Sequence, residues 1–430
     1  MLRSFRGMRF VSRSVWFLGA LFLIARGASD SRADWPQFRG PGGSGISTEK
    51  GGPLRWSQTQ NIIWKAELPG AGTSSPVIFG EKIFLTSYTG YNVPGQPGGA
   101  MQNLKRHVLC LRRDNGQLLW QQEVPSRLPE QASIREGHGY ASNTPIVDSE
   151  RVYAFFGKAG VFAFDHDGRQ LWHADVGSGL NGWGSAASPV LHKDLLIVNA
   201  SVESESLVAL NKKTGQRVWS APRIREAWNT PLLLPRVGGK TEVIVAVPGQ
   251  ILSFDADTGK PIWNCATDIG WYMVPSLVAE NGIICALGGR SGTAGLAVRA
   301  GGQGDVTRTH RLWTSNKGSN VTSPVLHNGY LYWMHENLGI AYCAEAKTGK
   351  LLYEQRLDRA GQVYASALLV DGKIYYLTRN GRMFVVAARP QFELLATNDL
   401  SDRAEFNASP AFDRGRLYVR SNRHLYCIGE

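Results

Sequence analysis

The sequence has few cysteines, and their spacing provides no recognisable chemistry. It contains five, at Cys110, Cys265, Cys285, Cys343 and Cys427. No two of them form a Cys-x-x-Cys pair and no Cys-x-x-Cys-His segment occurs, which excludes the usual covalent attachment of haem. Because the number is odd and the spacing is wide, we do not expect a disulfide framework.

Long basic runs and familiar catalytic motifs are also missing. The formal net charge is +12, but no basic run exceeds two residues such as Lys212-Lys213, so a nucleic-acid partner is not indicated. None of the nine histidines falls in a His-Glu-x-x-His segment, which argues against a catalytic zinc site, and we predict no metal site. The absence of Gly-x-Ser-x-Gly leaves a serine-hydrolase triad unsupported.

A single long apolar run lies near the amino terminus. It extends from Val15 to Ala25, follows an arginine-rich leader and precedes small residues that end at Ser31-Arg32-Ala33. This order is typical of a secretory signal, and about eleven apolar residues are too few to span a bilayer. We therefore expect residues 1–33 to be an export signal, the mature chain to lack a transmembrane segment, and the protein to be periplasmic or extracellular. A retained signal anchor is the alternative.

Glycine and aromatic residues are abundant, and they follow a repeating order. The 49 glycines and 13 tryptophans indicate many tight turns with aromatic packing. One unit recurs eight times, mostly at intervals of about 43 residues: a small or polar residue, a proline, two apolar strands and a third strand that ends in a glycine turn and an aromatic residue. The register positions are Pro76, Pro145, Pro189, Pro231, Pro275, Pro324, Ala367 and Pro410. The first interval is longer because polar insertions, expected to be loops, occupy about 87–106 and 125–139.

The turn of each unit carries the most specific signal. Two clear copies are Asn211-x-x-Thr214-Gly215-x-x-x-Trp219 and Asp255-x-x-Thr258-Gly259-x-x-x-Trp263, which suit a tight hairpin followed by an outer strand. We expect the aromatic residue to cover a neighbouring unit. The predicted docking residues are Trp64, Trp120, Trp172, Trp219, Trp263, Trp313 and Tyr353. Three of the cysteines fall where other units have alanine or serine, so we interpret them as small core residues.

Four strands in each unit predict an all-β fold, an eight-bladed β-propeller of four-stranded antiparallel blades. The chain ends after the third strand of the last blade, and residues 61–68 match the missing outer strand. We therefore expect residues 61–68 to close the ring, residues 34–60 to form an amino-terminal extension, and residues 61–430 to form a single propeller domain. Seven blades are the alternative, if residues 355–397 do not form one.

The repeat, with its Ala-x-Asp-x-x-Thr-Gly-x-x-x-Trp ending, resembles that of pyrroloquinoline-quinone-like propellers, over about residues 34–430. The segment Asp34-Trp35-Pro36-Gln37-Phe38-Arg39-Gly40-Pro41 is similar to the opening of exported members. The resemblance implies one of two functions, because the superfamily has two branches. One branch contains dehydrogenases that hold the quinone and calcium in the propeller mouth. The other resembles the outer-membrane assembly propeller, which binds proteins without a cofactor. Many quinoprotein alcohol dehydrogenases have two adjacent cysteines, which this chain lacks.

Segments that precede the register positions should surround the central channel, and they are rich in aromatic and polar residues. The candidates for a binding mouth are His138, Tyr140, Asn143, Trp183, Glu226, Trp228, Asn229, Trp271, Tyr272, Asn320, Tyr364, Glu405 and Asn407. Such groups suit a planar ligand, a sugar or a peptide loop, but they could equally pack loops together. Two of the candidates, Glu226 and Glu405, could form an acid–base pair, although the sequence does not fix their separation. The glycine-rich segment 299–305 is interpreted as a wide hairpin loop.

We therefore predict an exported, non-catalytic binding or scaffold protein of the cell envelope, a monomer with no cofactor. Its partners would be envelope proteins or polysaccharide ligands. The alternative is a quinone-dependent alcohol or sugar dehydrogenase with a divergent site, which would hold pyrroloquinoline quinone and calcium. A third hypothesis is a polysaccharide-acting enzyme that uses the two rim glutamates.

Overall fold

The computed structural model describes residues 1, 34–96, 98–135, 138–236 and 238–430. The chain divides into two compact units, Met1–Arg32 and Ala33–Glu430, and the second contains the blades. The predicted export signal lies outside the described residues, apart from Met1. Within the described part of the chain, no helix has the length and apolar character needed to cross a bilayer.

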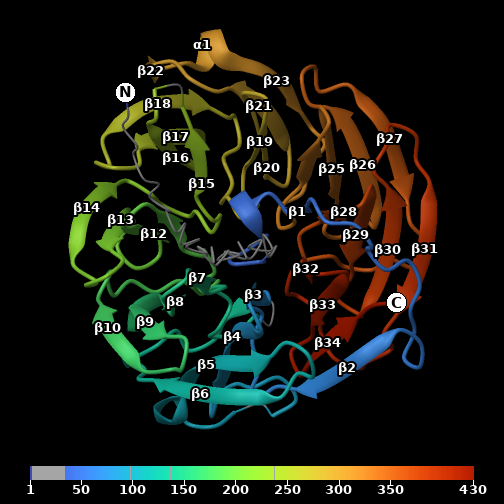
Figure 1. Cartoon of the computed structure of the whole chain (residues 1–430). Helices are drawn as coiled ribbons and strands as arrows, with labels where there is room; N and C mark the ends of the chain where they lie inside the picture. Colours follow the sequence, from blue (N-terminus) through green and yellow to red (C-terminus); the bar gives the residue numbers. More distant parts are fainter. Residues whose placement is uncertain (2–33, 97, 136–137, 237) are drawn as a thin grey trace. The chain divides into compact units, whose positions relative to one another are not determined.

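The described residues form eight sheets arranged as blades around a central hub (Figure 1). Blades 1 to 4 contain, from the hub outward, β3 (Val77–Phe79), β4 (Lys82–Thr89), β5 (Lys105–Arg112), β6 (Leu118–Val124); β7 (Ile146–Val147), β8 (Arg151–Phe155), β9 (Val161–Asp165), β10 (Gln170–Ala174); β11 (Val190–His192), β12 (Leu195–Ala200), β13 (Ser206–Asn211), β14 (Arg217–Pro222); β15 (Leu232–Pro235), β16 (Thr241–Val247), β17 (Gln250–Asp255), β18 (Pro261–Ala266). Blades 5 to 8 contain β19 (Val278–Glu280), β20 (Ile283–Leu287), β21 (Gly295–Arg299), β23 (Arg311–Ser315); β24 (Val325–His327), β25 (Tyr330–Met334), β26 (Ile340–Glu345), β27 (Leu351–Arg356); β28 (Leu368–Val370), β29 (Lys373–Leu377), β30 (Arg382–Ala387), β31 (Leu394–Asp399); β32 (Ala411–Asp413), β33 (Arg416–Arg420), β34 (His424–Ile428), β2 (Ile62–Glu67). The prediction of an eight-bladed propeller is confirmed, and the seven-bladed alternative is wrong because β28 to β31 form a complete blade.

The two ends of this unit pair to close the ring. Strand β2 lies antiparallel to β34, with Trp64 opposite Cys427 and Lys65 opposite Tyr426. Figure 1 shows the blue β2 at the outer edge of the red blade. The predicted closure by residues 61–68 is therefore confirmed.

A short strand from blade 5 extends blade 4. Strand β22 (Gly304–Asp305) comes from the glycine-rich segment of blade 5 and pairs parallel with β18 on the outer edge of blade 4. A one-turn helix, α1 (Thr307–His310), follows it. Part of the predicted wide hairpin loop is thus a strand that covers a neighbouring edge. Within the first insertion, residues up to Thr89 and from Lys105 continue β4 and β5, so the loop is shorter than expected.

In most blades the repeated aromatic residue on the outer strand contacts the next blade. Trp172 in blade 2 donates from its indole N–H to the Lys212 carbonyl oxygen in blade 3, over 3.0 Å. Its ring fills the space beside Gly215, where a Cβ atom would lie 2.7 Å from the indole. The same indole-to-turn hydrogen bond is made by Trp64, Trp120, Trp219 and Trp313. Trp263 instead donates to Glu242, and Tyr353 packs edge-on against Phe392.

A small residue stands opposite each of these aromatic residues in the strand pair. Ala209 faces Trp219, and Cys110 faces Trp120 in the same register. All five cysteines lie in the described segments, where each is buried and none forms a disulfide. Burial raises the pKa of the Cys110 and Cys343 thiols to about 12, so they stay protonated at neutral pH.

The segment 34–47 crosses the hub of the ring. Trp35 pairs with Ile78 of blade 1, and the Pro36 carbonyl accepts from the backbone of blade 2 over 2.9 Å. At the other end, β1 (Ile46–Ser47) pairs parallel with β28 of blade 7. Figure 1 shows this blue segment, including the 3-10 helix η1 (Pro41–Gly43), inside the ring. Residues 34–47 of the predicted extension therefore pack inside the ring, whereas the backbone of Trp56 donates to Asn398 on the outer strand β31.

Candidate functional site

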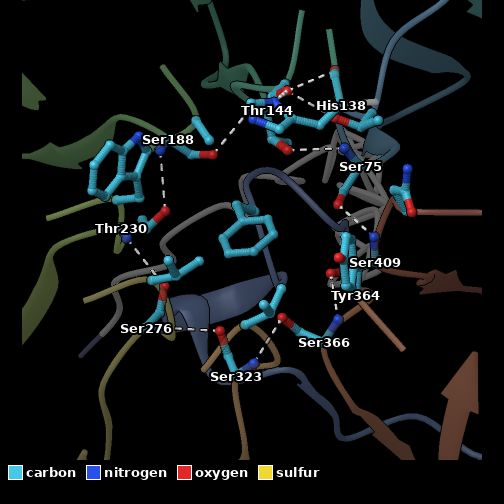
Figure 2. Close-up of a pocket in the computed structure, with 18 of the residues that line it drawn as sticks. Ser75, His138, Thr144, Ser188, Thr230, Ser276, Ser323, Tyr364, Ser366 and Ser409 are labelled. Atoms are coloured by element: carbon cyan, nitrogen blue, oxygen red, sulfur yellow. Dashed lines mark hydrogen bonds between the residues drawn. The ribbon is translucent and has the colours of Figure 1, made fainter. Parts of the chain in front are cut away.

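A closed ring of hydroxyl side chains surrounds the central channel where the innermost strands begin. The backbone N–H of each member donates to the hydroxyl oxygen of the member in the next blade, over 2.9 to 3.2 Å. The eight members, here called the hydroxyl ring, are Ser75, Thr144, Ser188, Thr230, Ser276, Ser323, Ser366 and Ser409. Figure 2 shows these hydrogen bonds as a continuous circuit around a cavity. The circuit fixes the spacing of the eight blades at the hub.

The ring corrects the predicted register of the fifth unit. In six units the hydroxyl residue directly precedes proline, but in the fifth unit Ser276 follows Pro275. Ser276 accepts the hydrogen bond from Thr230, so Leu277 occupies the position that the sequence assigned to Pro275. All eight units need the hydroxyl, because it accepts a hydrogen bond from a buried backbone N–H, whereas proline only restricts the backbone conformation.

The hydroxyl ring lines a cavity of about 200 Å³. Phe38 contributes to the lining from the segment that crosses the hub. Next to it, Arg39 is buried and donates to the Ser44 and Pro324 carbonyls, which attaches the segment to blade 6. The segment bonds to Ile78, Val147 and Leu369, which follow the ring hydroxyls along the chain, whereas the aromatic loops precede them.

An aromatic cluster forms one wall of the cavity. Trp183, Trp228 and Tyr272 line it, and the Tyr272 ring centroid lies 5.5 Å from that of Trp183 and 5.7 Å from that of Trp228. The indole N–H of Trp228 donates to the Gly184 carbonyl over 2.8 Å, which fixes the orientation of that ring. Trp271 lies 5.1 Å from Tyr272 between centroids and is 40% exposed. The mouth therefore presents rigid aromatic faces to the solvent.

Two arginines flank this aromatic wall. Arg290 lines the cavity, donates to the Tyr272 hydroxyl over 3.3 Å and lies 5.2 Å from the centre of the Trp271 ring. The guanidinium of Arg135 lies 5.1 Å from the centre of the Trp183 ring. Stacked guanidinium groups of this kind keep hydrogen-bond donors available at the edges of an aromatic surface.

The thirteen predicted mouth residues occupy three different environments. Those that line the cavity are His138, Trp183, Trp228, Tyr272, Tyr364 and Asn407. Those that are buried and make packing hydrogen bonds are Tyr140, Asn143, Asn229 and Asn320. Trp271 is exposed beside the cavity, whereas Glu226 lines a side groove and Glu405 pairs with Arg379 over 2.9 Å. The structure therefore does not bring the two glutamates together in the cavity.

Sequence reasoning missed several residues of the site. The hydroxyl ring could have been found from the repeated hydroxyl–proline pair, which the sequence displays in six units. Phe38 and Arg290 had no such signal, because neither lies in a repeated position. Their approach to the cavity depends on the path of segment 34–47 and of the loop between β20 and β21.

A hydroxyl–imidazole contact in the cavity lining is occupied by structural hydrogen bonds. Ser142 Oγ lies 2.6 Å from His138 Nδ1, donates to the His138 carbonyl over 2.9 Å and accepts from Thr73 over 2.9 Å. The Ser142 hydroxyl is thus held by three contacts within the fold.

The lining does not fit a calcium–quinone centre. Calcium takes carboxylate and carbonyl oxygens in proteins, but none of the described residues that line the cavity is a carboxylate. Within the described residues, no group of three or more His, Cys, Asp or Glu side chains is placed to hold a metal ion. The donor set is instead a ring of hydroxyls with aromatic faces and an arginine.

Comparison with known proteins relates the chain to a repeat family. Residues 57–281, a little over half of the chain, match the family described as outer membrane protein assembly factor BamB. Tetrathionate hydrolase of Acidithiobacillus ferrooxidans is 22% identical over 77% of this chain, which spans 59% of that protein. The assembly factor BamB of Shewanella oneidensis is 22% identical over 63% of this chain and 71% of its own length.

A solved structure shows the same fold. The quinohemoprotein alcohol dehydrogenase from Comamonas testosteroni superposes with a TM-score of 0.61 at 12% identity, and the match covers 93% of this chain and 81% of that one. At this identity the likeness concerns the propeller architecture, and function has to be argued from the site.

Proposed function

Because the chain belongs to the family of the outer membrane protein assembly factor BamB, we propose that it is an exported, non-catalytic binding protein of the cell envelope. Its binding site is the central cavity together with the aromatic mouth. The relative in Shewanella oneidensis is named for outer membrane protein assembly, which supports an envelope role.

One observation carries this proposal: the hydroxyl oxygens of the cavity are already used as acceptors by the fold. Each ring hydroxyl accepts the backbone N–H of the preceding blade, and Ser142 accepts from Thr73. Acid–base catalysis on a bound substrate needs a positioned group that can take up and release a proton, and carboxylates commonly serve. The described cavity lining contains no carboxylate, and its one imidazole, that of His138, is engaged with Ser142 Oγ over 2.6 Å, so its chemistry suits binding better than turnover.

The proposal is tested by photocrosslinking in intact cells. A photoreactive residue replaces Trp271 at the mouth or, as a control, Val218 on the outer strand β14, which is 52% exposed. We expect crosslinks to an envelope component from position 271 and none from position 218. Equal crosslinking from both positions, or none from either, would contradict a binding function at the mouth.

The competing function is a quinone-dependent alcohol or sugar dehydrogenase. The aromatic cavity at the centre of a quinoprotein-like propeller favours it. The purified mature chain is incubated with pyrroloquinoline quinone and calcium, and dye reduction is followed with alcohols and sugars. We expect neither quinone-dependent turnover nor a shift in the melting temperature. Turnover that requires both the quinone and calcium would contradict the binding proposal and show that the protein is a dehydrogenase.

A further inference from the structure

The cavity is lined by hydrogen-bond donors whose protons remain available. A serine or threonine hydroxyl has one proton and can also accept hydrogen bonds. In the hydroxyl ring the oxygen accepts from the neighbouring blade, and none of the eight members donates to another described residue. Up to eight O–H groups can therefore turn toward a ligand at the centre. A ligand that satisfies them needs acceptor oxygens around its whole circumference.

The mouth adds positive charge to these donors. The side chains of Arg135 and Arg290 stack on the Trp183 and Trp271 rings, and neither forms an ion pair with a described carboxylate. With no carboxylate among the described lining residues, two arginines at the mouth and a formal net charge of +7 for residues 34–430, the charge distribution favours an anion. Guanidinium groups bind carboxylates with two parallel hydrogen bonds.

The size and the walls of the cavity restrict the ligand further. A volume of about 200 Å³ lies below the roughly 300–1,000 Å³ typical of sites that enclose a whole drug-sized molecule. It is suited to one ring at the end or branch of a longer ligand. Trp228 and Tyr272 on the wall and Phe38 from segment 34–47 offer apolar surfaces to the C–H faces of such a ring.

From these features we infer that the cavity binds one acidic sugar residue of an anionic polysaccharide. The hydroxyl ring bonds the oxygens around the sugar, the aromatic wall contacts its C–H face, and Arg290 holds the carboxylate. The rest of the polymer leaves through the mouth past Trp271. This inference rests on the proposed binding function and specifies the ligand of the same site.

Calorimetric titration with defined oligosaccharides tests the inference. The probes are α-1,4-linked trigalacturonate and the neutral galactotriose of the same linkage. We expect trigalacturonate to bind at least tenfold more tightly than galactotriose, and its affinity to fall as sodium chloride is raised, because salt screens the arginine–carboxylate attraction. Equal affinity for the two probes, or no binding of either, would overturn the inference.

Matched arginine variants locate the binding. Arg290→Gln should weaken trigalacturonate binding at least tenfold and leave galactotriose unchanged. The control is Arg169→Gln, whose side chain is 78% exposed on blade 2 and pairs with Asp165 outside the cavity. We expect it to bind both probes as the unchanged protein does. Equal losses in the two variants would contradict the placement of the acid at Arg290.

The outcomes also separate this inference from the proposed function. Crosslinking of position 271 to an envelope protein, without measurable binding of trigalacturonate, would overturn the acidic-sugar inference and leave the binding function standing. Absence of both results would overturn both.

Discussion

Arg113 of blade 1 donates from Nη1 to Oδ2 of Asp413 in blade 8, over 2.6 Å. The Asp413 side chain is fully buried, and that of Arg113 is 11% exposed. This ion pair joins the first and last blades, and the pairing of Trp64 with Cys427 joins the two ends of the chain within the last blade. Arg420 adds a second link, since its guanidinium donates to the Ser74 and Thr86 carbonyls of blade 1.

Replacing the buried carboxylate should weaken the ring closure. Asp413→Asn leaves Arg113 partly buried with only Glu81 as its acidic partner, and we expect the free energy of unfolding to fall by about 3 kcal/mol. The control is Asp165→Asn, which removes the exposed pair with Arg169 and should cost at most about 0.5 kcal/mol. Urea unfolding curves of the two variants measure the difference, and similar costs would argue against a stabilising role for the buried pair.

Substituting a glycine that packs against an indole should lower the free energy of unfolding more than substituting a glycine in an open turn. Gly215 has φ +76°, and a Cβ there would lie 2.7 Å from Trp172. Gly329 has φ +80°, and no described atom lies within 4 Å of the point that a Cβ atom would occupy. Gly329→Ala should cost about 1 kcal/mol for the backbone alone, and Gly215→Ala about 3 kcal/mol because it also displaces the indole. Thermal unfolding compares them, and equal costs would contradict the docking of Trp172 on this turn.

The hydroxyl ring predicts a contrast between two replacements at one position. Ser409→Ala removes the acceptor of the Ser366 N–H and should lower the free energy of unfolding by about 1–2 kcal/mol. Ser409→Thr keeps the hydroxyl, as Thr144 and Thr230 do in other blades, and should lie within about 0.5 kcal/mol of the unchanged protein. Chemical denaturation distinguishes the two, and equal stabilities would show that the ring hydrogen bond contributes little.

Glu203 predicts a dependence of stability on pH. Burial raises the pKa of this carboxyl from 4.5 to about 7, and the neighbouring Ser185 hydroxyl offsets only part of this shift. Because the folded state holds this proton more tightly than the unfolded state, the stability that Glu203 contributes is fully present below pH 4.5 and is lost as the pH rises through 7. Between pH 5 and pH 8 the loss amounts to about 2 kcal/mol.

A neutral replacement should remove this dependence. In Glu203→Gln the fall in unfolding free energy between pH 5 and pH 8 should be about 2 kcal/mol smaller than in the unchanged protein. The control, Glu393→Gln, affects a half-exposed carboxylate paired with Arg389 and should leave the pH profile as it was. An unchanged profile in Glu203→Gln would contradict the raised pKa.

The architecture could be predicted from the sequence because each repeated residue makes the same local contact in the units where it occurs. Trp172 and Gly215 must fit each other, and the same fit recurs between Trp219 and Gly259. The sequence assigned the wrong register position, Pro275, to the fifth unit because proline usually follows the ring hydroxyl but is not needed for the ring hydrogen bond. In that unit the two residues exchange order, and the hydrogen-bonded ring keeps Ser276.

The centre of the site could not be predicted in the same way, because its parts occur once. Segment 34–47 binds the hub through contacts to blades that are far apart in sequence, such as the bonds of Arg39 to Pro324 and of Leu369 to Gly45. Likewise, the buried candidates Asn143 and Asn229 share the polar character of true lining residues, but their amides bond to neighbouring backbone carbonyls. Sequence alone does not separate an amide that binds a loop from one that faces a ligand.

The most direct measurement of the central claim, that the hub cavity is a ligand-binding site, is a crystal structure of the mature chain grown with trigalacturonate. We expect one uronate ring in the cavity against Phe38, within hydrogen-bond distance of the hydroxyl ring, with its carboxylate at Arg290 and the remaining sugars passing Trp271. A saturated crystal with the oligosaccharide bound elsewhere, and the cavity free of it, would contradict the account.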